Sequence, residues 1–333
     1  MTPIEDCLIN KSTKINPIWL MRQAGRYLPE FREIRKSNPD FIKLCLNHTL
    51  AEEITLQPIK RFGFDAAIIF SDILMIPHGM GQIVKFKKNF GPSLGALELN
   101  KLASLTEKDL TEKLSPIYKL LSSLKNSNEL KNKDLIGFVG APWTLLVYMV
   151  NKVSPKNGLS QEFFKDKVII NEILSLLDKF IKIHIENQIK AGATIIQIFD
   201  SWAGLIQNDF DKFLYNPTLS LVNHVKKLGV PVICFPRGIT DYIKFTKIVK
   251  PSMINIDYNV DPENLIKSLD VPIQGGLDPK ILLSGKENLK KQIKKYLDIF
   301  RDHPYVFNLG HGILPETKVD MVYELVETVR NYK

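Results

Sequence analysis

Eight short apolar runs, separated by segments with helical periodicity, constrain the fold of this 333-residue chain more than any other feature. The runs are continuous rather than alternating, which is typical of parallel strands covered on both faces. Eight strands alternating with helices predict an α/β fold, a single (β/α)8 TIM barrel. The predicted strands are Ile18–Met21, Ala66–Phe70, Leu135–Gly140, Thr194–Phe199, Val230–Phe235, Met253–Ile256, Pro272–Gln274 and Tyr305–Asn308.

Local signals place several helices between these strands. Thr49–Glu52 has the pattern of a capping box, so we predict a helix that begins there, runs to about Arg61 and ends near Gly63. Pro58 is expected to kink this helix or end it early, because proline removes a helical hydrogen bond. The further helices are predicted at about residues 107–124, 161–190, 209–227, 240–248, 262–269, 286–301 and 317–331.

The domain organisation is predicted to be simple. No internal repeat, low-complexity tract or Pro/Gly-rich linker marks a boundary. We therefore expect residues 1–333 to form one catalytic barrel domain, with residues 1–15 as an N-terminal extension. Ile76–Leu97 is long for a strand-to-helix connection and contains several glycines, so it predicts a hairpin or lid excursion after the second strand.

Composition narrows the cellular context. No apolar run reaches 18 residues, and the first residues lack the pattern of a secretory signal, so no membrane association is expected. The three cysteines are far apart and form no C-x-x-C pattern, which fits a reducing cytoplasm and simple packing as small apolar residues. They are Cys7, Cys45 and Cys234.

The net charge of +9 favours an anionic partner. The lysine-rich stretches 85–88 and 290–295 could be nucleic-acid patches, but the second lies on an amphipathic helix and reads more simply as a solvated face. No zinc-finger, RNP or helix-turn-helix pattern supports nucleic-acid binding. The charge alone does not separate a nucleic acid from a small polyanionic molecule, but no motif favours the nucleic acid.

Arginine is concentrated near the N-terminus in a chain that otherwise uses lysine. Four of the eight arginines fall within 14 positions: Arg22, Arg26, Arg32 and Arg35. A guanidinium grips carboxylate or phosphate with two parallel hydrogen bonds, which an ammonium cannot do. This stretch therefore predicts a site for an anion. The alternative is a solvated charged helix, because Glu30 and Glu33 lie close enough to pair with these arginines.

The barrel prediction also places a site, because catalytic groups in such barrels lie where the strands end. Polar residues that can carry out chemistry follow all eight predicted strands and so collect at one rim. They are Arg22, Gln23, Ser71, Asp72, Trp143, Tyr148, Asp200, Ser201, Arg237, Asp257, Asp278 and His311.

Four of these residues have alternative interpretations. Asp72 lies in an apolar stretch, where an ionised carboxylate is costly without a partner, so a functional role competes with helix capping or pairing with an arginine. Tyr148 on its apolar background could be a core residue, and Ser201 could be a helix N-cap. His311 is flanked by glycines at a strand end, which allows close approach of a ligand.

Motifs for common cofactors are absent. The chain has no G-x-G-x-x-G after a strand, no G-x-x-x-x-G-K-[ST], no H-E-x-x-H and no G-x-S-x-G. The six histidines are scattered and show no metal-ligand spacing. Nucleotide, dinucleotide and zinc-hydrolase chemistry are all disfavoured.

Five motifs in order, from about residue 15 to the C-terminus, resemble the uroporphyrinogen decarboxylase family. They are Met21–Pro29 (Met-Arg-Gln-Ala-Gly-Arg-Tyr-Leu-Pro), Phe70–Leu74, Gly137–Thr144, Gln274–Pro279 and Asn308–Gly312. One departure is Gly276, where the family pattern Gly-Asn-Leu-Asp-Pro has asparagine. This departure affects only the hydrogen bonding of its loop.

The resemblance implies a homodimeric barrel enzyme of haem and tetrapyrrole synthesis that needs no cofactor or metal. The family removes CO₂ from the four acetate side chains of uroporphyrinogen, leaving methyl groups. By position, Arg22, Arg26, Arg35, Ser201 and His311 would hold substrate carboxylates, and the backbone of Gln23, Ala24 and Gly25 would shape the turn. Asp72 would accept the pyrrole N–H groups, with Tyr148 beside it.

The chemistry needs a sink for the electron pair that decarboxylation leaves on carbon. A pyrrole protonated at a ring carbon is such a sink, and Asp72 would stabilise the cation electrostatically. The proton donor stays open between Arg22, a very poor acid, and a water. Two alternative functions remain. One is a cobamide-dependent methyltransferase of the same barrel superfamily, which would need His and Cys zinc ligands that Cys234 alone cannot supply. The other is a non-catalytic polyanion-binding protein.

Overall fold

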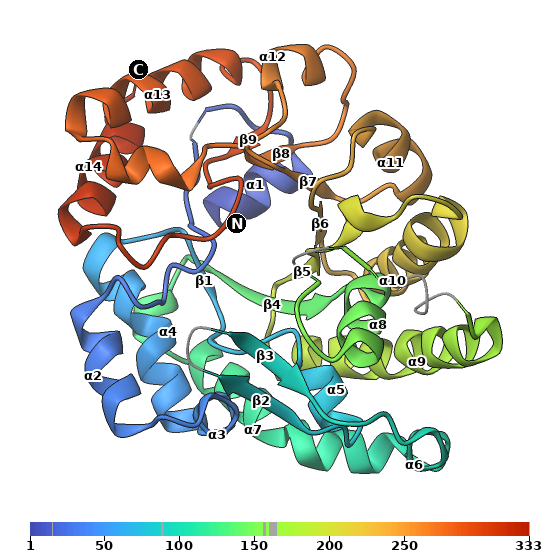
Figure 1. The fold of residues 1–333 in the computed structure, drawn as a ribbon. Coiled ribbons are helices and arrows are strands. Elements are labelled where there is room, and N and C mark those ends of the chain that lie inside the picture. Colours follow the sequence, from blue (N-terminus) through green and yellow to red (C-terminus); the bar gives the residue numbers. More distant parts are fainter. Residues whose placement is uncertain (15, 88–89, 156–157, 160–164, 333) are drawn as a thin grey trace.

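The computed structural model describes residues 1–14, 16–87, 90–155, 158–159 and 165–332. Seven parallel strands form one curled sheet, hydrogen bonded in the order β1-β4-β5-β6-β7-β8-β9, with helices packed outside it (Figure 1). The α/β fold class is confirmed, and seven of the eight predicted strands are found with ends shifted by at most two residues. They are β1 (Ala66–Ile68), β4 (Asp134–Gly140), β5 (Ile195–Asp200), β6 (Val232–Pro236), β7 (Met253–Ile256), β8 (Ile273–Gly275) and β9 (Tyr305–Val306).

The predicted first strand, Ile18–Met21, was wrong. Only Ile18 forms a bridge, to Phe307 beside β9, while its carbonyl accepts a hydrogen bond from Asp65 N just before β1, at 2.9 Å. An irregular segment therefore closes the barrel between β9 and β1. The strand stops because the N–H of Leu20 donates to Gln23 Oε1 at 3.1 Å, so a tight turn takes the place of the ladder.

The helices lie between the strands and around the barrel. They are α1 (Pro3–Ile9), α2 (Pro29–Ser37), α3 (Phe41–Cys45), α4 (His48–Phe62), α5 (Met75–Gly79), α6 (Leu99–Ala103), α7 (Glu107–Lys125), α8 (Pro142–Asn151), α9 (Lys167–Ala191), α10 (Asn216–Lys227), α11 (Tyr242–Val249), α12 (Pro262–Leu265), α13 (Lys286–Ile299) and α14 (Val319–Arg330). Most predicted helices are confirmed within a few residues, although α12 ends four residues early. The predicted start of α9, at residue 161, lies outside the described residues.

Helix α4 corrects the predicted cap and excludes one of the two effects expected of Pro58, an early end. Its N-cap is Asn47, whose side chain accepts from Leu50 N, so the predicted capping box at Thr49–Glu52 was wrong. Pro58 does not end the helix, which continues to Phe62. The predicted end is confirmed: Gly63 adopts the left-handed conformation, with φ of 67°, which suits a residue without a side chain.

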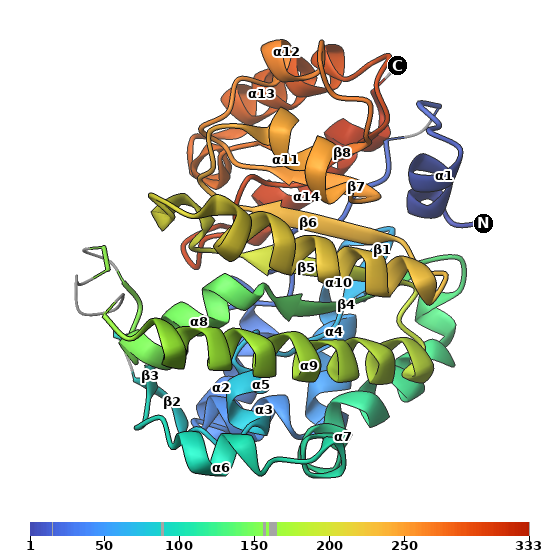
Figure 2. The same ribbon diagram turned by 90° about the vertical axis from the view of Figure 1, so that its right-hand side faces the viewer.

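The predicted excursion after the second strand is confirmed as a hairpin. Strands β2 (Val84–Lys87) and β3 (Gly91–Leu94) pair antiparallel, and Leu94 N donates to Lys152 O beyond the end of α8, at 2.7 Å. Figure 2 shows this hairpin and the end of α8 on the side of the barrel opposite α1. Because the strands are parallel, their carboxyl ends meet on the hairpin side, where the site is predicted. Among the described residues, no helix is long and apolar enough to cross a membrane.

Candidate active site

A tight turn carries Arg22 to the carboxyl end of the barrel. The side chain of Gln23 is fully buried and fixes this turn, because its amide donates to Ala66 O at 3.0 Å while its oxygen accepts from Leu20 N. Arg22 itself has a φ of 61°, an uncommon conformation for a residue with a side chain. The side chain of Arg22 is exposed and its stem lies against Gly312, at the carboxyl end of the barrel, which we call the mouth.

The segment after β9 holds Arg22 from the other side. Asn308 Oδ1 accepts from Met21 N at 2.9 Å and from Leu309 N at 2.8 Å, so one amide joins the Arg22 turn to the loop that carries His311. Gly312 lies directly under the arginine: a Cβ at this position would be 2.3 Å from Arg22 Cδ. Only glycine leaves room for the arginine stem here.

The charges that act on Arg22 identify its neighbours. Burial lowers the pKa of Arg22, the charges of Asp72 and Tyr148 raise it, and Arg26 and Arg237 lower it. The side chain is still accessible to solvent. Both observations hold for a guanidinium at the bottom of an open mouth, where protein surrounds it and water reaches it. Arg22 and Asp72 form no hydrogen bond or ion pair with each other, as far as the described residues go.

Asp72 follows β1 at the same mouth. One oxygen accepts from Leu74 N at 2.8 Å in a local turn. The N-cap of α5 is Leu74 and no side chain caps this helix, so the interpretation of Asp72 as a helix cap was wrong. The second oxygen accepts no hydrogen bond from another described residue. Burial raises the pKa of Asp72 to about 6 and outweighs the lowering effects of Leu74 N and of Arg22.

Helix α8 positions both Tyr148 and the turn that contains Ser201. Trp143 Nε1 donates to Trp202 O at 2.8 Å, and Trp202 N donates to Thr144 Oγ1 at 3.0 Å. The rings of Tyr148 and Trp202 meet edge to face at 6.0 Å. The N-cap of the short 3-10 helix here is Trp202, so the interpretation of Ser201 as an N-cap was wrong.

Beneath that turn, Asp200 joins β5 to α8. Thr144 Oγ1 donates to Asp200 Oδ1 at 2.6 Å, whereas Oδ2 is buried and has no hydrogen-bond partner in the described structure. Burial raises the pKa of Asp200 to about 7. The hydroxyl of Thr144 therefore accepts a hydrogen bond from Trp202 N and donates one to Asp200 Oδ1. These two bonds fix the backbone around Ser201.

His311 is a neutral imidazole in this surrounding. Burial and the positive charges of Arg22 and Arg237 lower its pKa to about 4. It can therefore donate one hydrogen bond and accept another at physiological pH. The same charges show that the ends of β6 and β9 and the Arg22 turn converge. The structure brings together Arg22, Arg26, Asp72, Tyr148, Arg237 and His311.

Arg35 has different surroundings. Its guanidinium donates to Asn38 O at 2.5 Å and lies over the Phe41 ring, with 5.4 Å from Cζ to the centroid. These contacts belong to the end of α2. Arg32 donates to the carbonyls of Arg26 and Tyr27, both at 3.0 Å, and so braces the turn without facing the mouth.

The unusual Gly276 is explained by a residue that the sequence analysis missed. Tyr296 OH donates to Gly276 O at 2.7 Å, and a Cβ on Gly276 would be 2.8 Å from Tyr296 Cε1. The tyrosine ring occupies the space that an asparagine side chain would need. Asn308, Gly312 and Thr144 were also missed as positioning residues, although all three lie within the motifs quoted above.

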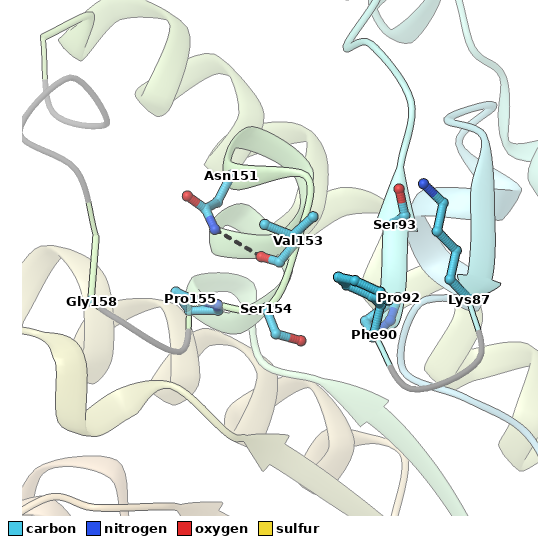
Figure 3. A pocket seen from close by; sticks show the side chains of 9 residues that line it. All are labelled: Lys87, Phe90, Pro92, Ser93, Asn151, Val153, Ser154, Pro155 and Gly158. Carbon is cyan, nitrogen blue, oxygen red and sulfur yellow. Dashed lines mark hydrogen bonds between the residues drawn. The ribbon is translucent and has the colours of Figure 1, made fainter.

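A separate surface cavity of about 460 Å³ opens between the β2–β3 hairpin and the segment after α8 (Figure 3). Lys87, Phe90 and Ser93 line one side, and Val153 and Ser154 the other. None of the residues predicted for the site lines this cavity. In the described part of the chain, no group of three or more His, Cys, Asp or Glu side chains is placed to hold a metal ion.

Comparison with known proteins decides the family. A protein-family model described as "Uroporphyrinogen decarboxylase (URO-D)" matches residues 2–332. This chain belongs to the uroporphyrinogen decarboxylase family.

Two relatives of that name illustrate the similarity. The uroporphyrinogen decarboxylase of Rickettsia bellii is 42% identical over 324 residues, which cover 95% of each chain. That of Rickettsia felis is 40% identical and covers 100% of this chain and 98% of the relative. Among solved structures, a methyltransferase from Methanosarcina mazei has a TM-score of 0.77, covers 98% of this chain and 96% of that one, and is 15% identical. The last match shows a shared fold alone.

Proposed function

We propose that this chain is a uroporphyrinogen decarboxylase, a carboxy-lyase of haem and tetrapyrrole biosynthesis. Its reaction removes the four acetate carboxylates of uroporphyrinogen III as CO₂ and yields coproporphyrinogen III. Membership of the family over residues 2–332 supports the proposal. The observation that carries it is the convergence of guanidinium groups with one half-satisfied carboxylate at the mouth of the barrel.

The mouth suits a substrate with eight carboxylates. The guanidinium groups of Arg22 and Arg26 donate no hydrogen bond to any other described residue, so their planar forks are available for carboxylates. We assign further carboxylate arms to Ser201, to the neutral imidazole of His311 and to Arg35. The backbone of Gln23, Ala24 and Gly25 shapes the turn that presents the first two arginines.

Asp72 is assigned the role of electrostatic stabiliser. Protonation of the pyrrole ring carbon next to the acetate-bearing one creates a cationic ring. The C–C bond to the carboxylate then breaks, CO₂ leaves, and the electron pair enters the ring. A second proton on the exocyclic carbon and loss of the ring proton give the methyl pyrrole. A carboxylate about 4 Å from the cation contributes roughly 4 kcal/mol at an effective dielectric of about 20, which is about a thousandfold in rate.

Tyr148 and Arg22 complete the catalytic set. The phenol of Tyr148 is buried, which raises its pKa and keeps it protonated as a hydrogen-bond donor beside Asp72. Arg22 holds a carboxylate opposite Asp72. The first proton comes from Arg22, a very poor acid, or from a water in the mouth.

We also propose that the chain is one catalytic domain, acts as a homodimer and works in the cytoplasm. The three cysteines are free thiols and all are buried, which fits a reducing compartment. Sedimentation at micromolar concentrations tests the dimer: a species of about 38 kDa, the mass of one chain, would contradict it.

The decisive experiment incubates the purified protein with uroporphyrinogen III under reducing conditions. Chromatography should show successive loss of four carboxyl groups, and no loss would refute the proposed activity. Two rivals have their own readouts. A cobamide-dependent methyltransferase would retain zinc on purification, whereas a polyanion-binding protein would bind nucleic acid with steep salt dependence and leave uroporphyrinogen intact.

A further inference from the structure

The eight arginines divide into two groups by what their guanidiniums bind. Five donate hydrogen bonds to described residues: Arg32, Arg35, Arg61, Arg301 and Arg330. Arg22, Arg26 and Arg237 donate none to the described part of the chain. Arg22 and Arg26 were expected to bind substrate carboxylates, as was the bonded Arg35. Arg237 shares their property and has been assigned no role.

The backbone of Arg237 lies directly against the turn that contains Ser201. Arg237 N donates to Asp200 O at 3.0 Å, and Arg237 O accepts from Gly204 N at 3.0 Å. These two bonds bracket Ser201. The loops are in close contact, because a Cβ on Gly204 would lie 2.7 Å from Gly238 O. Arg237 is therefore fixed next to a residue proposed to hold a carboxylate arm.

The side chain of Arg237 lies beside a carboxylate but donates no hydrogen bond to a described residue. Its Nε lies 3.6 Å from Asp257 Oδ2, too far for a hydrogen bond, and has no hydrogen-bond partner in the described structure. Asp257 is almost fully buried and is itself held by Asn259, whose N–H donates to Oδ1 at 3.2 Å. The acid thus fixes the direction of the guanidinium and leaves its donors free.

The charge of Arg237 is close enough to the shared mouth to act on other residues there. Its positive charge acts on both Arg22 and His311, which come from the turn after the closing segment and from the loop after β9. Among the described residues, Arg22, Arg26 and Arg237 bring three guanidiniums to this mouth, and Asp72, Asp200 and Asp257 are the carboxyl groups near them. An anionic ligand in this mouth would accept hydrogen bonds from the free donors of these guanidiniums.

We propose that Arg237 is a further substrate-binding residue, which binds a carboxylate arm of the tetrapyrrole between Ser201 and His311. Asp257 is the positioning residue that holds its guanidinium. This inference rests on the proposed function, because it takes the polycarboxylate substrate from there. It adds a binding residue from β6, on the opposite side of Ser201 from α8.

Kinetics of Arg237→Gln test the binding role. KM for uroporphyrinogen should rise by about tenfold to a hundredfold, because a charge-assisted bond is lost, while kcat of the first decarboxylation changes less than about threefold. Arg237→Lys should recover part of the loss. Arg301→Gln is the control, because Arg301 is bonded to Asp298 and Tyr332 at the surface. An unchanged KM in Arg237→Gln would overturn the inference.

Binding of uroporphyrin, the oxidised octacarboxylate, separates this inference from the proposed activity, because it requires no turnover. Fluorescence titration should show the same tenfold or greater weakening in Arg237→Gln and none in Arg301→Gln. If the wild-type protein binds uroporphyrin but does not decarboxylate uroporphyrinogen, the activity fails and Arg237 is still tested. Equal affinities of Arg237→Gln and the wild type would refute the binding role.

A double-mutant cycle tests Asp257. Asp257→Asn should raise KM less than Arg237→Gln does, and it should have no further effect in the Arg237→Gln background. Asp257→Glu should restore part of the KM. Additive effects of the two substitutions, or loss of kcat with an unchanged KM, would show that Asp257 does not act through Arg237.

Discussion

The two ends of the barrel differ in how fully their charged side chains are hydrogen bonded. At the amino end, covered by α1, carboxylates are fully satisfied. Asp65 accepts from Ile18 N at 2.7 Å and pairs with Arg330 at 2.9 Å. Asp134 accepts hydroxyl hydrogen bonds from Thr2 and Thr194. Every one of these groups ties two segments of the chain together.

At the carboxyl end, comparable groups keep unused hydrogen-bonding capacity. Asp72 receives a single backbone N–H, and Asp200 leaves one buried oxygen without a partner in the described structure. Arg22 and Arg237 donate to no described residue. A buried group without partners destabilises a fold by roughly 1–3 kcal/mol. The contrast indicates that the amino end stabilises the barrel, whereas the carboxyl end is organised for a ligand.

The strongest test of this contrast is Asp72→Asn, which keeps the shape and removes the charge. We expect kcat to fall by about a thousandfold, because the cationic ring loses its stabiliser. The variant should also be more stable at pH 7, by about 1–3 kcal/mol, since an ionised carboxylate with a raised pKa opposes folding. Activity within about threefold of wild type would rule out the stabiliser role.

The corresponding change at the amino end, Asp65→Asn, provides the matched control for Asp72→Asn. It removes the charge that pairs with Arg330 and should lower the unfolding temperature. The folded variant should keep its kcat. If Asp65→Asn lost activity like Asp72→Asn while folded, the division between the two ends would be incorrect.

Arg22→Lys should have the second largest effect. An ammonium keeps the charge but loses the two-pronged geometry, so we expect kcat/KM to fall by roughly tenfold to a hundredfold. Arg301→Lys, at a bonded surface arginine, should stay within about twofold. Steady-state kinetics with uroporphyrinogen checks both, and equal kcat/KM in the wild type and Arg22→Lys would show that the forked geometry is unnecessary.

Gly312→Ala should act through Arg22. The added methyl group would meet the arginine stem, at 2.3 Å from Cδ, so the guanidinium must move. We expect kcat/KM to drop by about tenfold, with little further loss when Gly312→Ala is added to Arg22→Lys. Gly63→Ala, at a helix end with open space around its Cβ position, is the control and should change stability alone. Full activity of Gly312→Ala would disprove the positioning role.

The pH dependence sharpens the same comparison. Asp72 must be ionised to stabilise a cation and has a pKa of about 6, so kcat/KM should fall about tenfold per unit as the pH drops below 6. The contribution of Asp72 to the free energy of unfolding changes in the opposite direction and becomes more favourable as the pH falls. The pKa of Asp72 in the folded protein is above the ordinary value of 3.8, so ionised Asp72 destabilises the folded state. This destabilisation is complete above pH 6 and disappears below about pH 4. A wild-type profile that is flat from pH 7 to pH 5 would contradict this assignment.

The sequence predicted the meeting of the site residues because parallel strands end on one side of their sheet. Arg22, Asp72 and His311 follow segments 18–21, β1 and β9, and their order along the chain was enough to place them together. The predicted closing strand was wrong because a turn forms in its place. Residues 18–21 are apolar, as in a buried strand, but the side-chain oxygen of Gln23, three residues on, captures the N–H of Leu20. The amide of Gln23 is held in that position by Ala66 O, a contact between distant residues that the sequence does not reveal.

Two further features of the structure depend on contacts between distant residues. Asn47 and Thr49 both offer acceptable caps for α4, and Glu52 accepts from Ser123 of α7 instead of completing a box. The loop at Gly276 depends on Tyr296, twenty residues away on α13. Sequence patterns thus predicted that Arg22, Asp72 and His311 lie near one another, whereas Arg35, predicted for the same site, is bonded at the end of α2. The contacts that hold them, such as Asn308 and Gly312, became visible only in three dimensions.

The smallest expected effect is that of Arg330→Gln at the amino end. Its ion pair with Asp65 is about one-third exposed on the arginine side, so we expect a loss of about 1 kcal/mol in the free energy of unfolding. Denaturant unfolding measures it, and kcat/KM should be unchanged because the pair lies far from the mouth. High salt should reduce the difference between the variant and the wild type, since screening already weakens the native pair. A loss of activity without a loss of stability would mean that the amino end also tunes the mouth, and the two ends could no longer be treated as independent.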